Sequence, residues 1–375
     1  MELKKDFSFA PRLDNPIHFP FPQVPNPLGL LTDLAGTWGG HGFNTIWRPH
    51  FQQQDRFLEL NLTNDQIEFD PISGPIPNRG LLQQDINMFG LTYLQQISDA
   101  NVIVNGNHEG LHIEPGIWAA VPATTNPAEG PTVVRMASIP HGTTILAQGT
   151  AAHAAGPPVI PNNNINPFPI NGSPSGPFPE QNLSVPTAFR SPPADIVGIT
   201  QGMVNNPNSV LQAAIAGLTI LATTTLHVTT KAAAPITGGG TDNTSFLAGG
   251  PGPNAPNAVA AEVFATFWIE TVKGTFPIPN FQQLQYTQTV ILNFNGLSWP
   301  HVTVATMRKA VPVKPPIWLI DPQIPKGLLE RAEAAAPKHP GDPEEKFTAD
   351  PVARIDAAPA PRTDLKSVAK EKPAT

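Results

Sequence analysis

The chain has 375 residues, of which 46 are proline and none is cysteine, and only 14% are charged, with a formal net charge of −7. This balance excludes the strongly basic surface that nucleic acid requires. The lack of cysteine excludes disulfides, thiolate catalysis and cysteine-ligated zinc or iron–sulfur centres, and it is compatible with a reducing compartment.

The N-terminal residues contain no apolar stretch typical of a secretory signal, and no run of 18 apolar residues occurs anywhere in the sequence. We therefore expect a cytoplasmic protein without a membrane span, of unknown oligomeric state. The prolines crowd into a leader (1–30), an insert (151–194) and a tail (321–375). The remaining chain, roughly 200–230 residues, is enough for one β-barrel domain within 31–320.

The first 44 residues predict an extended leader that runs into a bent strand. The spacing of prolines in the leader denies both helix and central strand, and we expect it to lay Phe19, Phe21 and Leu31 onto the body. Glycines at four positions within 34–44 indicate a strand that is strongly bent or closely crossed by another backbone.

Short alternating runs then follow one another at regular spacing, separated by turn residues. The candidate strands are 45–52, 56–63, 66–70 and 91–97, followed by the strands of 110–150. This spacing favours a mainly β, antiparallel meander barrel over an α/β fold.

The densest chemistry lies within 110–150. His112 and Glu114 are two residues apart, so on a strand they face the same way. They form either an acid–base pair beside a pocket, the candidate catalytic residues, or a hydrogen-bonded structural pair. Arg135 is expected to be structural, and His141 falls in a turn.

The proline-, asparagine- and glycine-rich insert has no periodicity, and we expect Phe168 and Phe178 to anchor it as a lid over a cavity mouth. One short amphipathic helix follows Asn206-Pro207, and 218–230 and 262–274 return to the sheet. The tail from residue 338 onward has too few large apolar residues to fold and is expected to be disordered.

The end of the barrel is the most specific stretch of the sequence. Alternating runs on both sides of Asn295-Gly296 predict a hairpin with a type I′ turn. In the second run, alternation places His301, Thr303, Ala305 and Met307 on one face. His301 thus lies beside small residues that leave room for a ligand.

Four stretches in this order resemble the nitrobindin family of heme-binding β-barrels: 34–42, 111–118, 137–149 and 297–308. The resemblance covers about 34–150 and 200–309. It implies a lipocalin-like or fatty-acid-binding-protein-like barrel that holds a b-type heme, with His301 as the iron (metal) ligand. The further candidate heme-binding residues are Thr303, Thr37 and Trp38.

Three functions remain open. The resemblance implies a heme protein that senses or acts on nitric oxide, peroxynitrite or peroxide, including a peroxynitrite isomerase. The same cavity without iron would serve a lipocalin-like binder of an apolar small molecule. A heme peroxidase-type enzyme of secondary metabolism is the third.

Overall fold

The computed structural model describes residues 26–50, 55–172, 176–231, 236, 238–251, 255–275 and 279–310, together with the backbone of 7–9 and 311–312. These residues belong to one compact unit, Met1–Val313. The predicted tail, Phe19 and Phe21 lie outside the described residues. Leu31 is fully buried, as expected.

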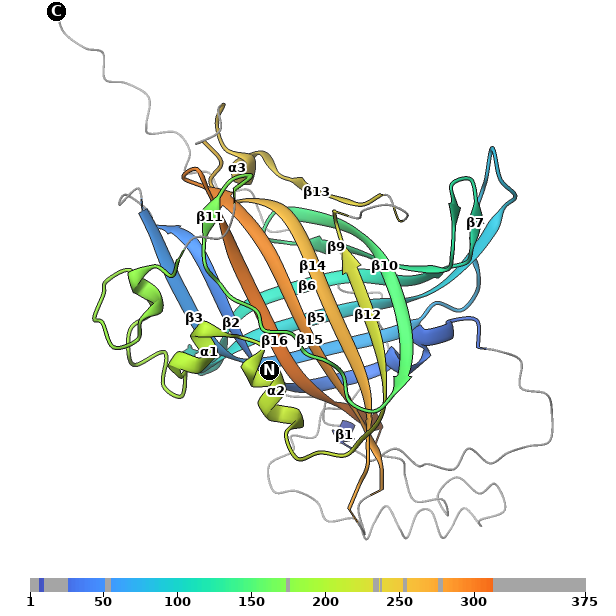
Figure 1. The fold of residues 1–375 in the computed structure, drawn as a ribbon, viewed down its shortest axis with the longest axis horizontal. Helices are drawn as coiled ribbons and strands as arrows, with labels where there is room; N and C mark the ends of the chain where they lie inside the picture. Colours follow the sequence, from blue (N-terminus) through green and yellow to red (C-terminus); the bar gives the residue numbers. More distant parts are fainter. Residues whose placement is uncertain are drawn as a thin grey trace, which may run out of the picture. The chain divides into compact units, whose positions relative to one another are not determined.

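Ten antiparallel strands form a closed barrel, which confirms the predicted mainly β meander (Figure 1). Each strand pairs with the next one along the chain, and the last pairs with the first. The barrel strands are β2 (Gly36–His50), β3 (Asp55–Pro71), β5 (Ile86–Val104), β6 (Asn107–Val121), β9 (Thr132–Ile139), β10 (Thr143–Ala155), β12 (Ile220–Thr229), β14 (Val259–Val272), β15 (Phe281–Phe294) and β16 (Leu297–Pro312).

Smaller elements decorate the barrel. The strands are β1 (Phe7–Phe9), β4 (Ile76–Asn78), β7 (Thr124–Thr125), β8 (Ala128–Glu129), β11 (Phe168–Pro169) and β13 (Gly240–Asn243). The helices are η1 (Gly29–Leu34), η2 (Pro179–Gln181), α1 (Gln201–Asn205), α2 (Ser209–Ile215) and α3 (Ser245–Ala248). Helix α2 is the one that the sequence predicted. Among the described residues, no helix has the length and apolar character needed to cross a membrane.

The barrel strands are longer than the sequence predicted, because two expected breaks are absent. The runs predicted at 34–44 and 45–52 meet without a break in the single strand β2, Gly36–His50, and 56–63 and 66–70 both belong to β3. Asn64 and Asp65, which read as a turn, instead pair with His41 and Gly40 of β2. Leader residues 7–9 form an edge strand, β1, on β16.

The glycines of β2 allow the barrel to close against β16. A Cβ atom on Gly40 would lie 2.1 Å from the carbonyl oxygen of Thr306, and one on Gly42 would lie 2.2 Å from that of Val304. Only glycine permits so close an approach of two backbones. The expected close crossing of the first strand is therefore confirmed.

The hairpin prediction is also confirmed. Asn295 and Gly296, between β15 and β16, have φ angles of 49° and 72°, as a type I′ turn requires. Along β16 the interior face carries Ala305 and Met307 in the barrel core, whereas Val302 and Val304 pack into a second apolar cluster on the outer face.

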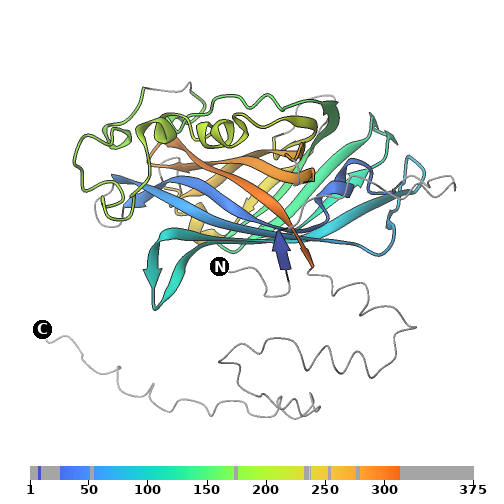
Figure 2. The same cartoon turned by 90° about the horizontal axis from the view of Figure 1, so that it is seen from below.

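The described part of the insert covers the outside of the barrel and not its mouth. Strand β10 continues to Ala155, and the described residues from there to α2 lie along one outer side of the barrel (Figure 2). Trp47 donates to the carbonyl oxygen of Ile165 at 2.8 Å, and Phe178 packs against Trp47 and Trp299. The lid prediction is wrong, because the apolar side chains of the insert pack against the outer face of β2, β3 and β16 and bury it.

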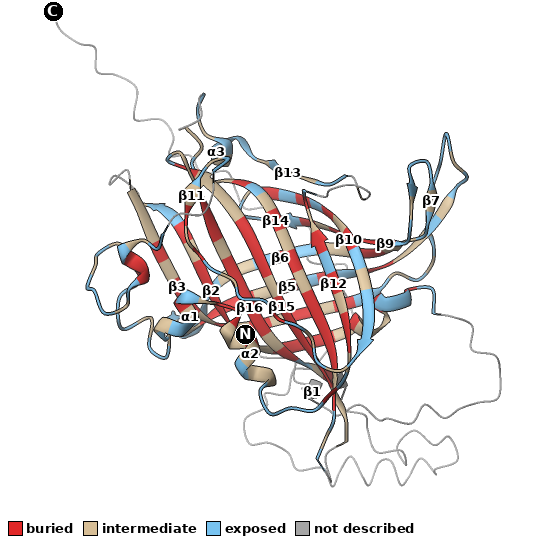
Figure 3. Ribbon diagram, in the orientation of Figure 1, coloured by how far each residue is buried: buried red, intermediate tan, exposed pale blue. Residues whose placement is uncertain are grey.

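One half of the barrel interior is filled with large side chains; we call it the filled half. Figure 3 shows buried residues running as stripes along the strands. Trp118 lies edge-on to Phe267, with ring centroids 5.2 Å apart. Helix η1 packs against this core through Leu31 and Leu34, and Trp38 donates from Nε1 to the carbonyl oxygen of Leu34 at 2.7 Å.

Candidate functional site

The other half of the barrel holds a cavity of about 260 Å³; we call it the cavity half. Nine of its lining residues are aliphatic, and the polar ones include three histidines. The lining residues are Asn44, Ile46, Arg48, Glu59, Gln95, Ile97, Leu111, His112, Ile139, His141, Thr143, Leu247, Ala258, Ala260, Tyr286, Gln288, Val290, Leu292, His301 and Thr303. None of the described insert residues is among them.

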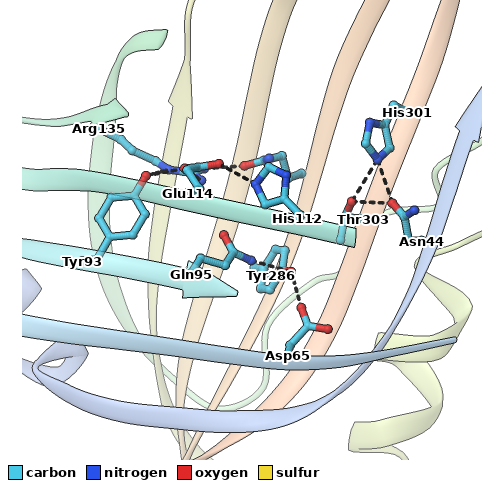
Figure 4. Close-up of polar contacts among 11 residues, drawn as sticks. Asn44, Asp65, Tyr93, Gln95, His112, Glu114, Arg135, Tyr286, His301 and Thr303 are labelled. Atoms are coloured by element: carbon cyan, nitrogen blue, oxygen red, sulfur yellow. Dashed lines mark hydrogen bonds and ion pairs between the residues drawn. The ribbon is translucent and has the colours of Figure 1, made fainter. Parts of the chain in front are cut away.

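A buried layer of charged and polar side chains forms the floor of this cavity (Figure 4). Arg135 pairs with Glu114 and donates to Gln288 Oε1 at 2.5 Å and to Tyr93 Oη at 2.9 Å. Tyr93 donates in turn to Glu114. Arg135 is thus structural, as expected, since its charge is satisfied inside the protein and does not face a ligand.

The predicted pair of His112 and Glu114 exists, with His112 Nε2 lying 3.2 Å from Glu114 Oε2. Burial alone would raise the pKa of Glu114, but Arg135 and the hydrogen bonds from His112 and Tyr93 lower it to about 2. Glu114 is therefore an ionised acceptor tied to Arg135, and no described contact brings it to the cavity. His112 is the member of the pair that lines the cavity.

A second carboxylate completes the floor. Asp65 accepts hydrogen bonds from Thr63 and from Tyr286, both at 2.6 Å, and Gln95 donates to Tyr286 Oη at 2.8 Å. Burial raises the pKa of Asp65 to about 6, although the two hydrogen bonds oppose the shift. Of these residues, Tyr286 and Gln95 line the cavity.

His301 lies on the cavity wall, as the alternation predicted. Its Nε2 atom is 2.7 Å from Asn44 Oδ1, which also accepts from the Thr303 hydroxyl at 2.9 Å. Burial, with the nearby His112 and His141, lowers the pKa of His301 to about 3, so the imidazole is neutral at physiological pH. Among the described residues, Nδ1 of His301 has no hydrogen-bonding partner.

His112 and His141 stack with ring centroids 5.3 Å apart. Both rings line the cavity and also a groove of about 770 Å³ beside the β5–β6 hairpin. Burial, and then the charge of His112, lowers the pKa of His141. The stacked pair therefore stands between the barrel interior and a surface groove.

The mouth of the cavity is formed by strand ends and by the segment between β12 and β14. Arg48 pairs with Glu59 at 2.8 Å there. Leu247 of α3 faces the cavity, and Asn243 ties its segment to β14 through hydrogen bonds to and from the backbone of Ala260. No pattern in the sequence indicated that this glycine-rich segment, and not the insert, borders the mouth.

The structure brings His112, His301 and Thr303 to one cavity, and Glu114 directly behind it. It does not bring Thr37 or Trp38 there. Trp38 belongs to the core of the filled half, and neither residue lines the cavity.

Sequence reasoning missed the polar residues that complete the site: Asn44, Asn61, Asp65, Gln95, Asp99, Tyr286 and Gln288. All of them are buried. The sequence did contain a signal for these residues, because amide and carboxylate side chains occupy interior positions of alternating strands, where apolar residues are expected.

Among the described residues, no group of three or more histidines and carboxylates is arranged to hold a metal ion. The three cavity histidines therefore do not form a metal centre of that kind. Comparison of the chain with protein-family models and with curated proteins gives no match.

Proposed function

We propose that this protein binds a small, mainly apolar molecule in the cavity half of its barrel. The observation that carries the proposal is the contrast inside the barrel, where aliphatic side chains from several strands surround a cavity above a hydrogen-bonded polar floor. Binding sites are typically apolar cavities with a few placed polar groups, and barrel mouths are among their preferred positions.

The size and polarity of the cavity define the class of ligand. About 260 Å³ lies just below the roughly 300–1,000 Å³ of sites for drug-sized molecules, which points to a compact ligand such as a one- or two-ring compound. The imidazole of His301 is neutral, and Arg135 and Glu114 in the floor pair with each other, so none of these three groups offers a free charge to a ligand.

Filling the cavity tests this proposal. Ala260 faces the cavity, whereas its neighbour Ala261 is exposed on the outer face, so the two alanines form a matched pair. Ala260→Phe should abolish the binding of indole measured by calorimetry, and Ala261→Phe should leave it unchanged. Equal indole binding by both variants, or none by the wild type, would contradict the proposal.

Heme, the cofactor implied by the nitrobindin resemblance, is the second candidate. In its favour, His301 faces the cavity, and its Nδ1 atom has no partner within the part of the chain that the structure describes. Against it, Nε2 is held by Asn44, and a cavity below the roughly 300 Å³ needed for drug-sized ligands does not accommodate a porphyrin. The residues as arranged do not fit a heme, and we rank the chemistry of nitric oxide, peroxynitrite and peroxide below simple binding.

An absorption spectrum separates the two candidates. Hemin added to the wild type and to His301→Ala should give the same spectrum in both if the cavity is a site for small apolar molecules. A Soret band that is retained only by the wild type would favour heme and would require the barrel to open around His301.

A further inference from the structure

A chain of hydrogen-bonded side chains lies on the inner face of the barrel beside the cavity and ends at His301. Asp99 of β5 accepts from Asn61 Nδ2 at 2.8 Å, and Asn61 Oδ1 accepts from Asn44 Nδ2 at 3.0 Å. Asn44 Oδ1 then faces both His301 and Thr303. This chain of hydrogen bonds crosses four neighbouring strands, β5, β3, β2 and β16. Its first three members, Asp99, Asn61 and Asn44, are 0–8% exposed, and His301 at its end is half-buried on the cavity wall.

At the Asp99 end of this hydrogen-bonded chain, the direction from donor to acceptor is fixed. Asp99 Oδ1 accepts from the backbone N–H groups of Asn101 and Val102, at 2.6 and 2.9 Å, and a backbone N–H can only donate. The other carboxylate oxygen is likewise an acceptor and requires the amide nitrogen of Asn61 to face it.

That polarity propagates through both amides, because an amide has its donor and its acceptor on opposite arms. With Asn61 Nδ2 turned to Asp99, Asn61 Oδ1 must face Asn44. Asn44 then turns its nitrogen to Asn61 and its oxygen to the cavity wall. An oxygen there only accepts, so Nε2 of His301 carries the proton and Nδ1 has a free lone pair.

We propose that Asp99 is a positioning residue: through Asn61 and Asn44 it fixes His301 as the Nε2–H tautomer, so that the cavity selects ligands carrying a hydrogen-bond donor such as a hydroxyl or an N–H group. The second part of this inference rests on the proposed binding function and deepens it. The first part concerns the ligand-free protein and stands apart from it.

The replacement Asp99→Asn tests the first part, because it changes one atom of the side chain and hardly its shape. The oxygen of the new amide keeps the two backbone donors, which places its N–H₂ group toward Asn61. Both natural amides then turn over, and Asn44 Nδ2 faces His301. We expect the tautomer of His301 to switch to Nδ1–H, observed by ¹⁵N NMR of the imidazole nitrogens in ligand-free protein, with a His301→Gln spectrum for assignment.

Two further variants make the test specific. Adding Asn44→Asp to Asp99→Asn moves the carboxylate to the other end of the chain and should restore the Nε2–H tautomer. Asp65→Asn, a buried replacement of the same kind outside the chain, should leave the tautomer of His301 as in the wild type. If Asp99→Asn does not fold, Asn44→Leu is measured instead and should show both tautomers.

An Nδ1–H tautomer in the wild type, an unchanged tautomer in folded Asp99→Asn, or a single Nε2–H form in Asn44→Leu would each overturn the positioning role. The ligand part is tested by calorimetry with indole, which only donates, and 1-indanone, which only accepts. The wild type should prefer indole, and Asp99→Asn should shift the preference toward 1-indanone by roughly tenfold. A switched tautomer with an unchanged preference would overturn the selection, whereas binding of neither compound would contradict the proposed function and not the tautomer.

Discussion

The two halves of the barrel are built from the same strands and differ in what fills them. In the filled half, Trp118 packs edge-on against Phe267, and Trp38 and the η1 residues Leu31 and Leu34 belong to the same apolar core. In the cavity half, the interior positions of the same strands carry valine, isoleucine, alanine, amides and histidines. The difference shows that a cavity inside a barrel requires two features. The interior side chains around it must be small, and a polar layer, the floor, must close it off from the packed core.

The floor is what allows a dense core and a cavity to share one barrel. Glu114, Arg135, Tyr93 and Gln288 satisfy one another across the interior, and Asp65, Tyr286 and Gln95 do so beside them. A buried polar layer of this kind is stable only when its members are paired, since an orphaned charge in the interior costs several kcal/mol.

The largest effect is expected from breaking the floor. Arg135→Met leaves Glu114 as an uncompensated buried charge and should lower the free energy of unfolding in urea by about 3–5 kcal/mol. The double variant Arg135→Met/Glu114→Gln removes both charges and should recover a large part of that loss. A single variant as stable as the wild type would show that the floor does not divide the two halves.

The pH dependence of unfolding offers a second test of the floor. Burial raises the pKa of Asp65 from 3.8 to about 6, so the protonated form is favoured in the folded state. Asp65 therefore contributes about 3 kcal/mol to the free energy of unfolding. This contribution is fully present below pH 3.8 and is lost as the pH rises through 6. Asp65→Asn should remove this part of the pH dependence. An unchanged slope between about pH 4 and 6.5 would contradict the assignment.

The smallest expected effect compares the same truncation, valine to alanine, in the two halves. Val228→Ala opens a new void in the filled half and should cost about 2–3 kcal/mol. Val290→Ala, on the wall of the cavity half, removes atoms that already border empty space and should cost about 1 kcal/mol. Urea unfolding measures both, and equal costs would mean that the cavity half is packed as tightly as the filled half.

Much of the barrel could be predicted from local pattern. The alternation along β16 assigned His301 and Thr303 to one face and Val302 and Val304 to the other, and Asn295-Gly296 marked the turn before it. The glycines of β2 predicted a close backbone approach, which occurs at Gly40 and Gly42. These are consequences of backbone geometry within a few residues, and the sequence contains them directly.

The partners of His301 could not be predicted in this way. Asn44 and Asn61 lie opposite each other only because β2 and β3 pair in one particular register, and Asp99 joins them through β5. The insert led to a similar error, since its composition showed that it cannot fold alone but not which apolar surface it covers.

The sequence by itself determined the fold class, the order of the strands and the two faces of β16, because these depend on periodicity and turn chemistry between near neighbours. Only the tertiary structure decided which half of the barrel stays hollow, where the insert packs and which nitrogen of His301 contacts Asn44. Those outcomes depend on contacts between residues such as Asp99 and His301, which are about 200 positions apart in the chain and are brought together by the register of four strands.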